Sequence, residues 1–192
     1  MSSDSITFAG LEVSSGRKPI TFAALDDDLK VAAMDQWKPS QALECLHDYG
    51  SLWLAVSTPS VERLIDEDLR KKVIEAGFTL YPGRGDSKQL LVTNAQDCFQ
   101  ALIGQKLLSR RSLEGRLQRT AILYEQGLQI KDPIDVFEEI TRYKLMQGIL
   151  PLEDIPSAKE LDALVVAYVA WLAVNRPGQI VSRGGVVLPE PE

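Results

Sequence analysis

Short hydrophobic runs separated by turn-forming residues characterise the first 37 positions of the chain. The runs cover 6–13, 20–25 and 29–37, and the polar segments Ser14-Ser15-Gly16 and Asp26-Asp27-Asp28 lie between them. Strands joined by connections this short pair with their neighbours in the chain in antiparallel fashion. The pattern therefore predicts three antiparallel strands at the start of the protein.

Beyond residue 38 the pattern changes, and helical periodicity alternates with short apolar runs typical of buried strands. The predicted elements are, in order, a helix at about 39–49, a strand at 52–56, a helix at about 61–76, a short extended segment at 78–81, one or two helices at 94–127, a strand at 134–137, a helix at about 138–147, a helix at 157–174 and two short strands at 179–188. We interpret residues 1–192 as a single α/β domain in which 78–127 is a helical insertion.

The helix predicted at 157–174 contains one anomalous residue. Ser157 and Glu160 have the spacing of a capping box, which favours a helix start at this point. From Leu161 to Val174 the sequence is almost wholly apolar, and Asp162 carries its one charge. A carboxylate on an apolar helix face is costly unless it is paired, hydrogen-bonded or bound to a cation. Asp162 is therefore either an acid that the helix dipole favours or a functional residue.

Composition narrows the class of protein. A hydrophobic fraction of 45% and a charged fraction of 25% are those of a globular protein. The apolar run at 161–174 is too short for a membrane span, and the N-terminus does not resemble a signal peptide, so we expect a cytoplasmic protein with no membrane partner. Cys45 and Cys98 indicate neither a disulfide framework nor a zinc site. With His47 as its one histidine, the chain is a poor candidate for a Ser-His-Asp or Cys-His hydrolase.

The net charge of −6 argues against a protein coated in nucleic acid, but it permits a local basic surface. Such a surface is a candidate at 106–119, where one acid, Glu114, accompanies five basic residues: Lys106, Arg110, Arg111, Arg116 and Arg119. Two interpretations stay open. The segment is either a solvated basic helix or a surface that contacts the nucleic-acid backbone.

Four short motifs, in this order, resemble those of the ribonuclease H-like fold, which ribonuclease H, the RuvC resolvases and many transposases share. The motifs are Gly10-Leu11-Glu12-Val13-Ser14, Val56-Ser57-Thr58-Pro59, Ile134-Asp135-Val136-Phe137-Glu138 and Leu161-Asp162-Ala163-Leu164. The chain is most similar in these respects to a family of uncharacterised predicted nucleases of that fold. The resemblance implies a mixed sheet of three antiparallel strands followed by parallel strands, flanked by helices.

The resemblance also implies a carboxylate site for Mg²⁺ or Mn²⁺ that hydrolyses phosphodiester bonds of nucleic acid. Glu12, Asp135 and Asp162 match the catalytic and metal-binding acids of the family. Hard cations prefer such oxygen ligands, and two of them about 3.5–4 Å apart stabilise the attacking and leaving oxygens. The basic residues at 106–119 would then contact the phosphate backbone.

Three departures from the family pattern keep a second hypothesis open. Glu12 stands where Asp is usual, Asp135 stands where Glu is usual, and Ser57 stands where relatives commonly have an acid. Three acids can hold one metal, with Ser57 orienting a water or a ligand in an outer position. The alternative is a catalytically impaired member of the fold that serves as a binding module. A phosphotransferase of the actin-like fold is a weaker third interpretation, because a phosphate-binding glycine loop is not evident.

Overall fold

The structure is a computed structural model of the chain. It describes residues 6–13, 19–38, 41–47, 49–57, 73–83, 87–144, 146–148 and 155–190. Most of the helix predicted at about 61–76 lies outside these residues, as do the turn at 14–16 and positions 58 and 59 of the second motif.

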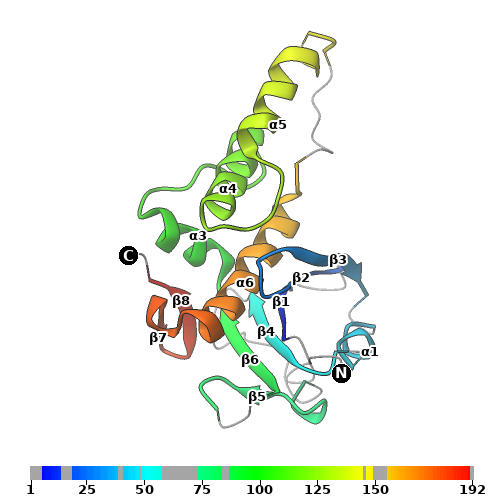
Figure 1. Ribbon diagram of the computed structural model, residues 1–192, viewed down its shortest axis with the longest axis vertical. Helices are drawn as coiled ribbons and strands as arrows, with labels where there is room; N and C mark the ends of the chain where they lie inside the picture. The colour runs from blue at the N-terminus through cyan, green and yellow to red at the C-terminus, as the bar shows by residue number, and fades with distance from the viewer. Residues whose placement is uncertain are drawn as a thin grey trace.

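A six-stranded mixed sheet forms the centre of the fold (Figure 1), with the order β3-β2-β1-β4-β6-β5. The strands are β1 (Thr7–Glu12), β2 (Ile20–Leu25), β3 (Val31–Trp37), β4 (Leu52–Ser57), β5 (Thr79–Leu80) and β6 (Lys88–Thr93). Strands β1, β2 and β3 pair in antiparallel fashion, whereas β1, β4, β6 and β5 run parallel. The predicted fold class, a ribonuclease H-like mixed sheet flanked by helices, is therefore confirmed.

One strand of the sheet comes from a segment for which the sequence predicted only helices and a short extended piece. Strand β6 lies within 78–127, between β4 and β5, and its last five residues are buried. Polar residues at 88, 89 and 93 leave an apolar run of only three positions, which is too short to reveal a buried strand by pattern alone. The helical part of 78–127 is limited to α3 (Ala95–Ile103) and α4 (Leu113–Glu125).

The prediction of a strand at 134–137 is wrong, because these residues form helix α5 (Pro133–Glu139). Asp132 caps this helix by accepting a hydrogen bond from the Ile134 amide, and Pro133 occupies its first turn, where proline is tolerated. The helix buries Val136, and Ile140 follows one turn later at the start of the π-helical segment Ile140–Lys144. Ile134 is exposed although it is two residues before buried Val136, and a strand would place both side chains on the same face.

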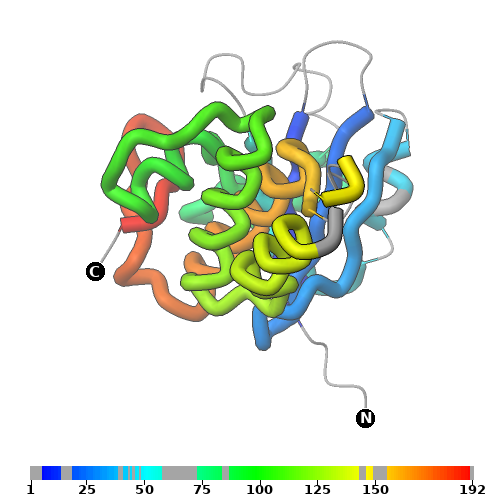
Figure 2. Tube along the Cα trace, turned by 90° about the horizontal axis from the view of Figure 1, so that it is seen from above, coloured from blue at the N-terminus to red at the C-terminus, as the bar shows by residue number. Residues whose placement is uncertain are grey.

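Helix α6 (Ala158–Asn175) confirms the helix predicted at 157–174, including its capping box. The Ser157 hydroxyl accepts a hydrogen bond from the Glu160 amide at 3.3 Å, and the Glu160 carboxylate accepts one from the Ser157 amide. The helix lies between the sheet and helices α3 and α4 (Figure 2), and it is buried from Leu161 to Ala173. Its all-round apolar character follows from this position between two layers.

Helix α6 lies unusually close to β1 at Gly10. A Cβ atom added to Gly10 would lie 2.0 Å from the Ala163 carbonyl oxygen and 2.6 Å from the Ala167 nitrogen. A side chain is therefore excluded at this position, and the helix backbone contacts the strand directly. This contact brings the start of α6 close to the end of β1.

The remaining elements complete the two layers around the sheet. Helix α1 (Ala42–His47) packs on the sheet face opposite α6, whereas α5 projects beyond α4 (Figure 1). The two predicted C-terminal strands are confirmed as the hairpin of β7 (Ile180–Arg183) and β8 (Val186–Pro189). Within the described residues, none of the helices is long and apolar enough to cross a membrane.

Candidate functional site

A row of polar residues crosses the face of the sheet that α6 covers. One residue on each of four adjacent strands contributes, in the order Thr21, Glu12, Ser57 and Thr93. Two or four positions away on the same strands, the residues that pack against α6 in the core are Ala23, Phe8, Ala55 and Leu91. Because side chains alternate between the two faces of a sheet, all four polar residues lie on the α6 side.

Asp162 projects from the second turn of α6 toward Glu12, and Arg110 contacts both acids. The Arg110 Nη2 atom lies 2.8 Å from the Asp162 carboxylate and 3.9 Å from that of Glu12. Asp162 is only 4% exposed and Glu12 only 9%, whereas the Arg110 side chain is 43% exposed. Two of the three predicted acids, Glu12 and Asp162, therefore lie close together, and Arg110 contacts both.

The environment of Asp162 raises its pKa from the ordinary 3.8 to about 6. Burial is the largest cause, because an apolar surrounding disfavours the charged carboxylate. Arg110 opposes the rise, the negative charge of Glu12 adds to it, and the more distant Arg119 lowers the pKa. Asp162 is thus a desolvated acid whose charge depends on nearby cations.

The turn that carries Arg110 is held firmly on α4. The Leu108 amide donates to the Gln118 side chain at 2.8 Å, and the Leu108 carbonyl accepts from Arg119 at 3.1 Å. The Ser112 hydroxyl donates to the Ser109 carbonyl and caps α4 by accepting from the Gly115 amide. These bonds fix both ends of the turn at 108–112, so the Arg110 side chain reaches Asp162 from a backbone that is held in place.

Sequence reasoning missed Arg110 as a partner of the acids and missed the two threonines of the polar row. Buried Thr21 is the direct neighbour of Glu12 on β2, and its hydroxyl has no hydrogen-bond partner among the described residues. The Thr93 hydroxyl donates to the Val187 carbonyl at 2.6 Å and lies 2.9 Å from the Cys98 sulfur. Alternation along β1 and β2 was the available signal for Thr21.

Ser57 occupies the strand position where an acid was expected, directly beside Glu12. Its hydroxyl accepts a hydrogen bond from the Ala95 amide at 3.2 Å, at the start of α3. Ser57 therefore connects the end of β4 to α3 and still lies next to the carboxylate pair. Its predicted outer role at the site stays a prediction.

Asp135 does not join the other two acids. It lies in the first turn of α5, where it is exposed, because the buried side of this helix is formed by Val136. A hydrogen bond to Asp132 is the main cause that raises the pKa of Tyr124, and the charge of Asp135 adds to it. The charges that act on Asp162 come from Arg110, Glu12 and Arg119. The assignment of Asp135 as a catalytic and metal-binding residue required a strand at 134–137. Because these residues form a helix, the structure does not support that assignment.

The five basic residues of 106–119 do not form one surface. Lys106, Arg110 and Arg111 are exposed, whereas Arg116 donates hydrogen bonds to the carbonyls of Ile155 and Pro156. Arg119 is 1% exposed, and its guanidinium also donates to Gln96 and lies over the Phe99 ring. Arg116 and Arg119 therefore stabilise the local fold, which corrects their assignment as nucleic-acid-binding residues.

The donor atoms at the site fit one divalent cation. Across the part of the chain that the structure describes, no cluster of three or more His, Cys, Asp or Glu side chains could hold a metal ion. Two carboxylates are enough for Mg²⁺, which usually keeps several waters and binds one or two carboxylates together with substrate phosphates. The partnerless Thr21 hydroxyl beside Glu12 provides a further oxygen. Two acids do not provide the ligands of a two-metal centre.

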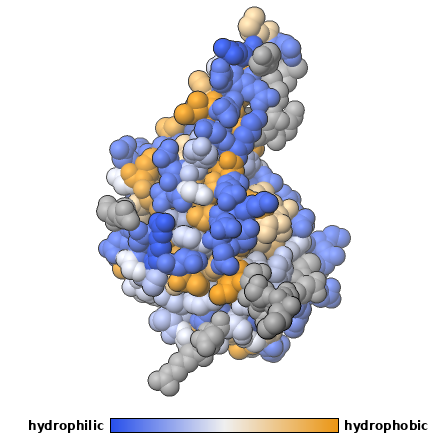
Figure 3. All heavy atoms as spheres, in the orientation of Figure 1, coloured by the Kyte–Doolittle hydropathy of each residue, from blue (hydrophilic) through white to orange (hydrophobic). Residues whose placement is uncertain are grey.

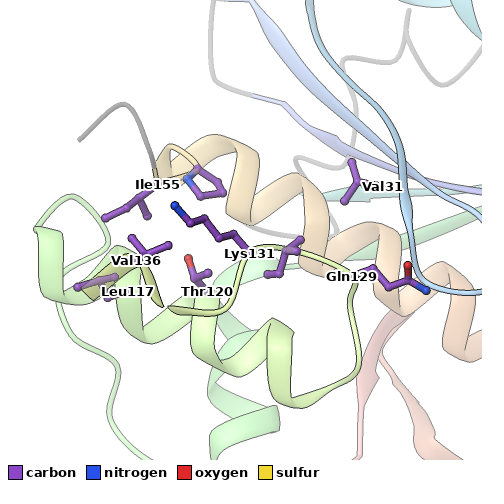
Figure 4. Close-up of a pocket in the computed structure, with 9 residues that line it drawn as sticks. Val31, Leu117, Thr120, Gln129, Lys131, Val136 and Ile155 are labelled. Atoms are coloured by element: carbon purple, nitrogen blue, oxygen red, sulfur yellow. The ribbon is translucent and has the colours of Figure 1, made fainter. Parts of the chain in front are cut away.

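A separate, mainly apolar cavity of about 280 Å³ lies near the base of α5 (Figure 4). Leu117, Val136 and Ile155 line one part of it, and Val31 and Gln129 line another. Apolar residues are also exposed along the projecting helices (Figure 3), including Ile134 and Phe137 of α5. Neither Glu12 nor Asp162 lines this cavity, so it is distinct from the carboxylate site.

Comparisons with known proteins found a structural likeness but no sequence match. No protein-family model and no curated protein matches the sequence. Among solved structures, the large terminase nuclease from thermophilic phage G20c is similar to 86% of this chain and to 82% of its own, with 15% identity and a TM-score of 0.43. A score this low carries no conclusion about function, so membership of the predicted-nuclease family stays a prediction.

Proposed function

We propose that this protein is a metal-dependent nuclease whose phosphodiester-hydrolysing site is the pair Glu12 and Asp162, with one Mg²⁺ or Mn²⁺ ion as its cofactor. The observation that carries the proposal is the convergence of these two buried acids. They come from the first strand and the last long helix, and Arg110 lies against both. Asp162, whose pKa is raised by burial, is a desolvated acid of the kind typical of functional sites.

Each part of the site has a proposed task. Glu12 and Asp162 would hold the cation, which supplies Lewis-acid polarisation of a phosphodiester oxygen when bound. Thr21 and Ser57, on either side of Glu12, would orient water through their hydroxyl groups. Lys106 and Arg111 are exposed near the turn of Arg110, and they would contact the nucleic-acid backbone.

Cleavage assays with and without Mn²⁺ or Mg²⁺ test the proposal on plasmid DNA, single-stranded DNA and RNA. We expect Asp162→Asn to lower the cleavage rate by about 100-fold or more, because a metal ligand is lost. Asp135→Asn removes one charge from an exposed site and serves as the control that should cleave like the wild type. Equal rates for the wild type and Asp162→Asn would contradict the proposal.

A second candidate function, a non-catalytic binding module, is supported by the same arginine. Arg110 pairs with the carboxylates without a metal, and Ser57 on β4 and Thr93 on β6 place hydroxyls where further acids could have stood. A protein of this kind would bind nucleic acid and leave it uncut at every metal concentration. The cleavage assay, combined with a binding measurement on the same substrates, separates the two functions.

A further inference from the structure

We infer that Arg110 is a built-in exchangeable cation that couples metal binding to nucleic-acid binding. In the unbound protein it pairs with the metal-binding acids, and a phosphate of the substrate draws it away when a divalent cation takes its place. This inference rests on the proposed function, and it concerns how the same site is regulated. The contacts of Arg110, its exposure and the construction of its turn support it.

The guanidinium of Arg110 lies against Glu12 and Asp162, where a metal bound by these two acids would also lie. Its Nη2 atom lies 2.8 Å from one carboxylate and 3.9 Å from the other, so guanidinium and metal compete for the same negative charge. Both cations cannot sit against these two acids without strong repulsion. Binding of a divalent cation at Glu12 and Asp162 therefore requires Arg110 to move.

The difference in exposure shows which partner can leave. The Asp162 side chain is 6% exposed and stays with α6, whereas the Arg110 side chain is 43% exposed. An uncompensated buried carboxylate is costly, so Arg110 leaves readily only when another cation replaces it. Arginine forms bidentate hydrogen bonds with phosphate, which makes the nucleic-acid backbone a suitable new partner for it.

The backbone of the turn at 108–112 is held on α4 in the position from which Arg110 contacts Asp162. Both the amide and the carbonyl of Leu108 are bonded to side chains of α4. A Cβ atom on Gly115 would lie 1.8 Å from the Ser109 carbonyl oxygen, so the turn packs directly on the α4 backbone. The backbone that carries Arg110 is fixed, and exchange involves the side chain alone.

Exchange of this kind makes two ligands cooperative. Nucleic acid that holds Arg110 would expose the carboxylates to the metal, and bound metal would release Arg110 for phosphate. By linkage, each ligand must raise the affinity of the other by the same factor, typically 5- to 150-fold. Removal of Arg110 would abolish this coupling and strengthen metal binding in the absence of substrate.

Calorimetric titration with Mn²⁺, with and without a nuclease-resistant phosphorothioate oligonucleotide, tests the inference. For the wild type, we expect the oligonucleotide to strengthen Mn²⁺ binding by about fivefold or more. For Arg110→Ala, Mn²⁺ should bind about fivefold or more tightly without the oligonucleotide and gain nothing from its addition. Arg142→Ala removes the same charge from an exposed pair with Glu138 and should behave like the wild type.

Arg110→Gln is the second variant, because its amide can still donate to Asp162 if Arg110→Ala does not fold. Unchanged Mn²⁺ affinity in the Arg110 variants would overturn the inference and leave the metal site intact. Weaker Mn²⁺ binding in these variants would also overturn it, because Arg110 would then assist the metal. If neither the wild type nor the variants bind Mn²⁺, the proposed function itself fails.

Discussion

Burial of the Asp162 carboxylate in an apolar helix costs hydration energy, and the surrounding charges only partly compensate for this cost. Arg110 forms a close ion pair with Asp162, and Glu12 adds a second negative charge nearby. The balance leaves its pKa at about 6, above the ordinary value of 3.8. The acid therefore makes the metal-free fold less stable when it is ionised.

Stability measured against pH tests this description of Asp162 in buffer that contains a chelator. The carboxyl favours folding while it is protonated, so its contribution is complete below pH 3.8 and is lost as the pH rises through about 6. Asp162→Asn does not titrate. From pH 4 to pH 7 the free energy of unfolding of the wild type should fall relative to this variant by up to about 3 kcal/mol. A constant difference, measured by denaturant unfolding, would contradict the burial of Asp162.

Single residues were predictable where they violated a local pattern. Asp162 stood out because a charge in an apolar run is costly wherever the helix packs, whereas Glu12 was recognised only through the family resemblance. Arg110 carried no such signal, because its contact with Asp162 joins positions 52 residues apart through tertiary structure. Asp135 was assigned through the family motif on a strand predicted at 134–137, and packing of Val136 and Ile140 on one helical side overrode that local strand preference.

At the level of elements, the contact between β1 and α6 determines the geometry of the site. Gly10 is two residues before Glu12, and Ala163 directly follows Asp162. The approach of backbone to backbone at Gly10 therefore sets the distance between the two acids.

Gly10→Ala tests this role of the contact. The added methyl group would lie 2.0 Å from a carbonyl oxygen of α6, so the helix must shift. We expect a loss of about 3 kcal/mol in the free energy of unfolding, at the upper end for overpacked cores, together with weaker Mn²⁺ binding. Gly178→Ala is the matched control, because nothing lies within 4 Å of its added methyl group. Equal melting temperatures for both variants would refute the close contact.

Most elements followed from patterns within the chain, and the exceptions have physical causes. The meander, α6 and the C-terminal hairpin were readable because turn residues and capping residues mark their ends. Strand β6 could not be recognised from the sequence pattern, because its apolar run covers only three residues. Helix α5 was misread because four residues are too few to distinguish a strand from one turn of helix.

At the scale of the whole molecule, the acidic net charge of −6 restricts where a polyanion can bind. Two of the five basic residues of 106–119 are committed to internal contacts, and Arg110 is paired with the acids. Lys106 and Arg111 are exposed, so the segment presents a narrower basic surface than its composition indicated. The antiparallel pairing of the first three strands was predictable from the sequence, whereas the place of β6 in the sheet was not. The description of the chain as one domain stays a prediction.

The salt dependence of nucleic-acid binding measures the size of this surface. Each phosphate contact contributes about 0.9 to the slope of log affinity against log salt for duplex DNA. The double variant Lys106→Ala/Arg111→Ala should therefore reduce the slope by about two and weaken binding to all sequences equally. Fluorescence anisotropy at several salt concentrations provides the measurement. An unchanged slope would show that the backbone binds elsewhere on the protein.

Anomalous diffraction from crystals soaked in Mn²⁺ tests the central claim most directly, because it locates the cation without relying on activity. We predict one anomalous peak between the carboxylates of Glu12 and Asp162, with the Arg110 side chain moved away from Asp162, and no such peak in crystals of Asp162→Asn. A peak elsewhere with Arg110 still bound to Asp162, or no peak at saturating Mn²⁺, would contradict the account.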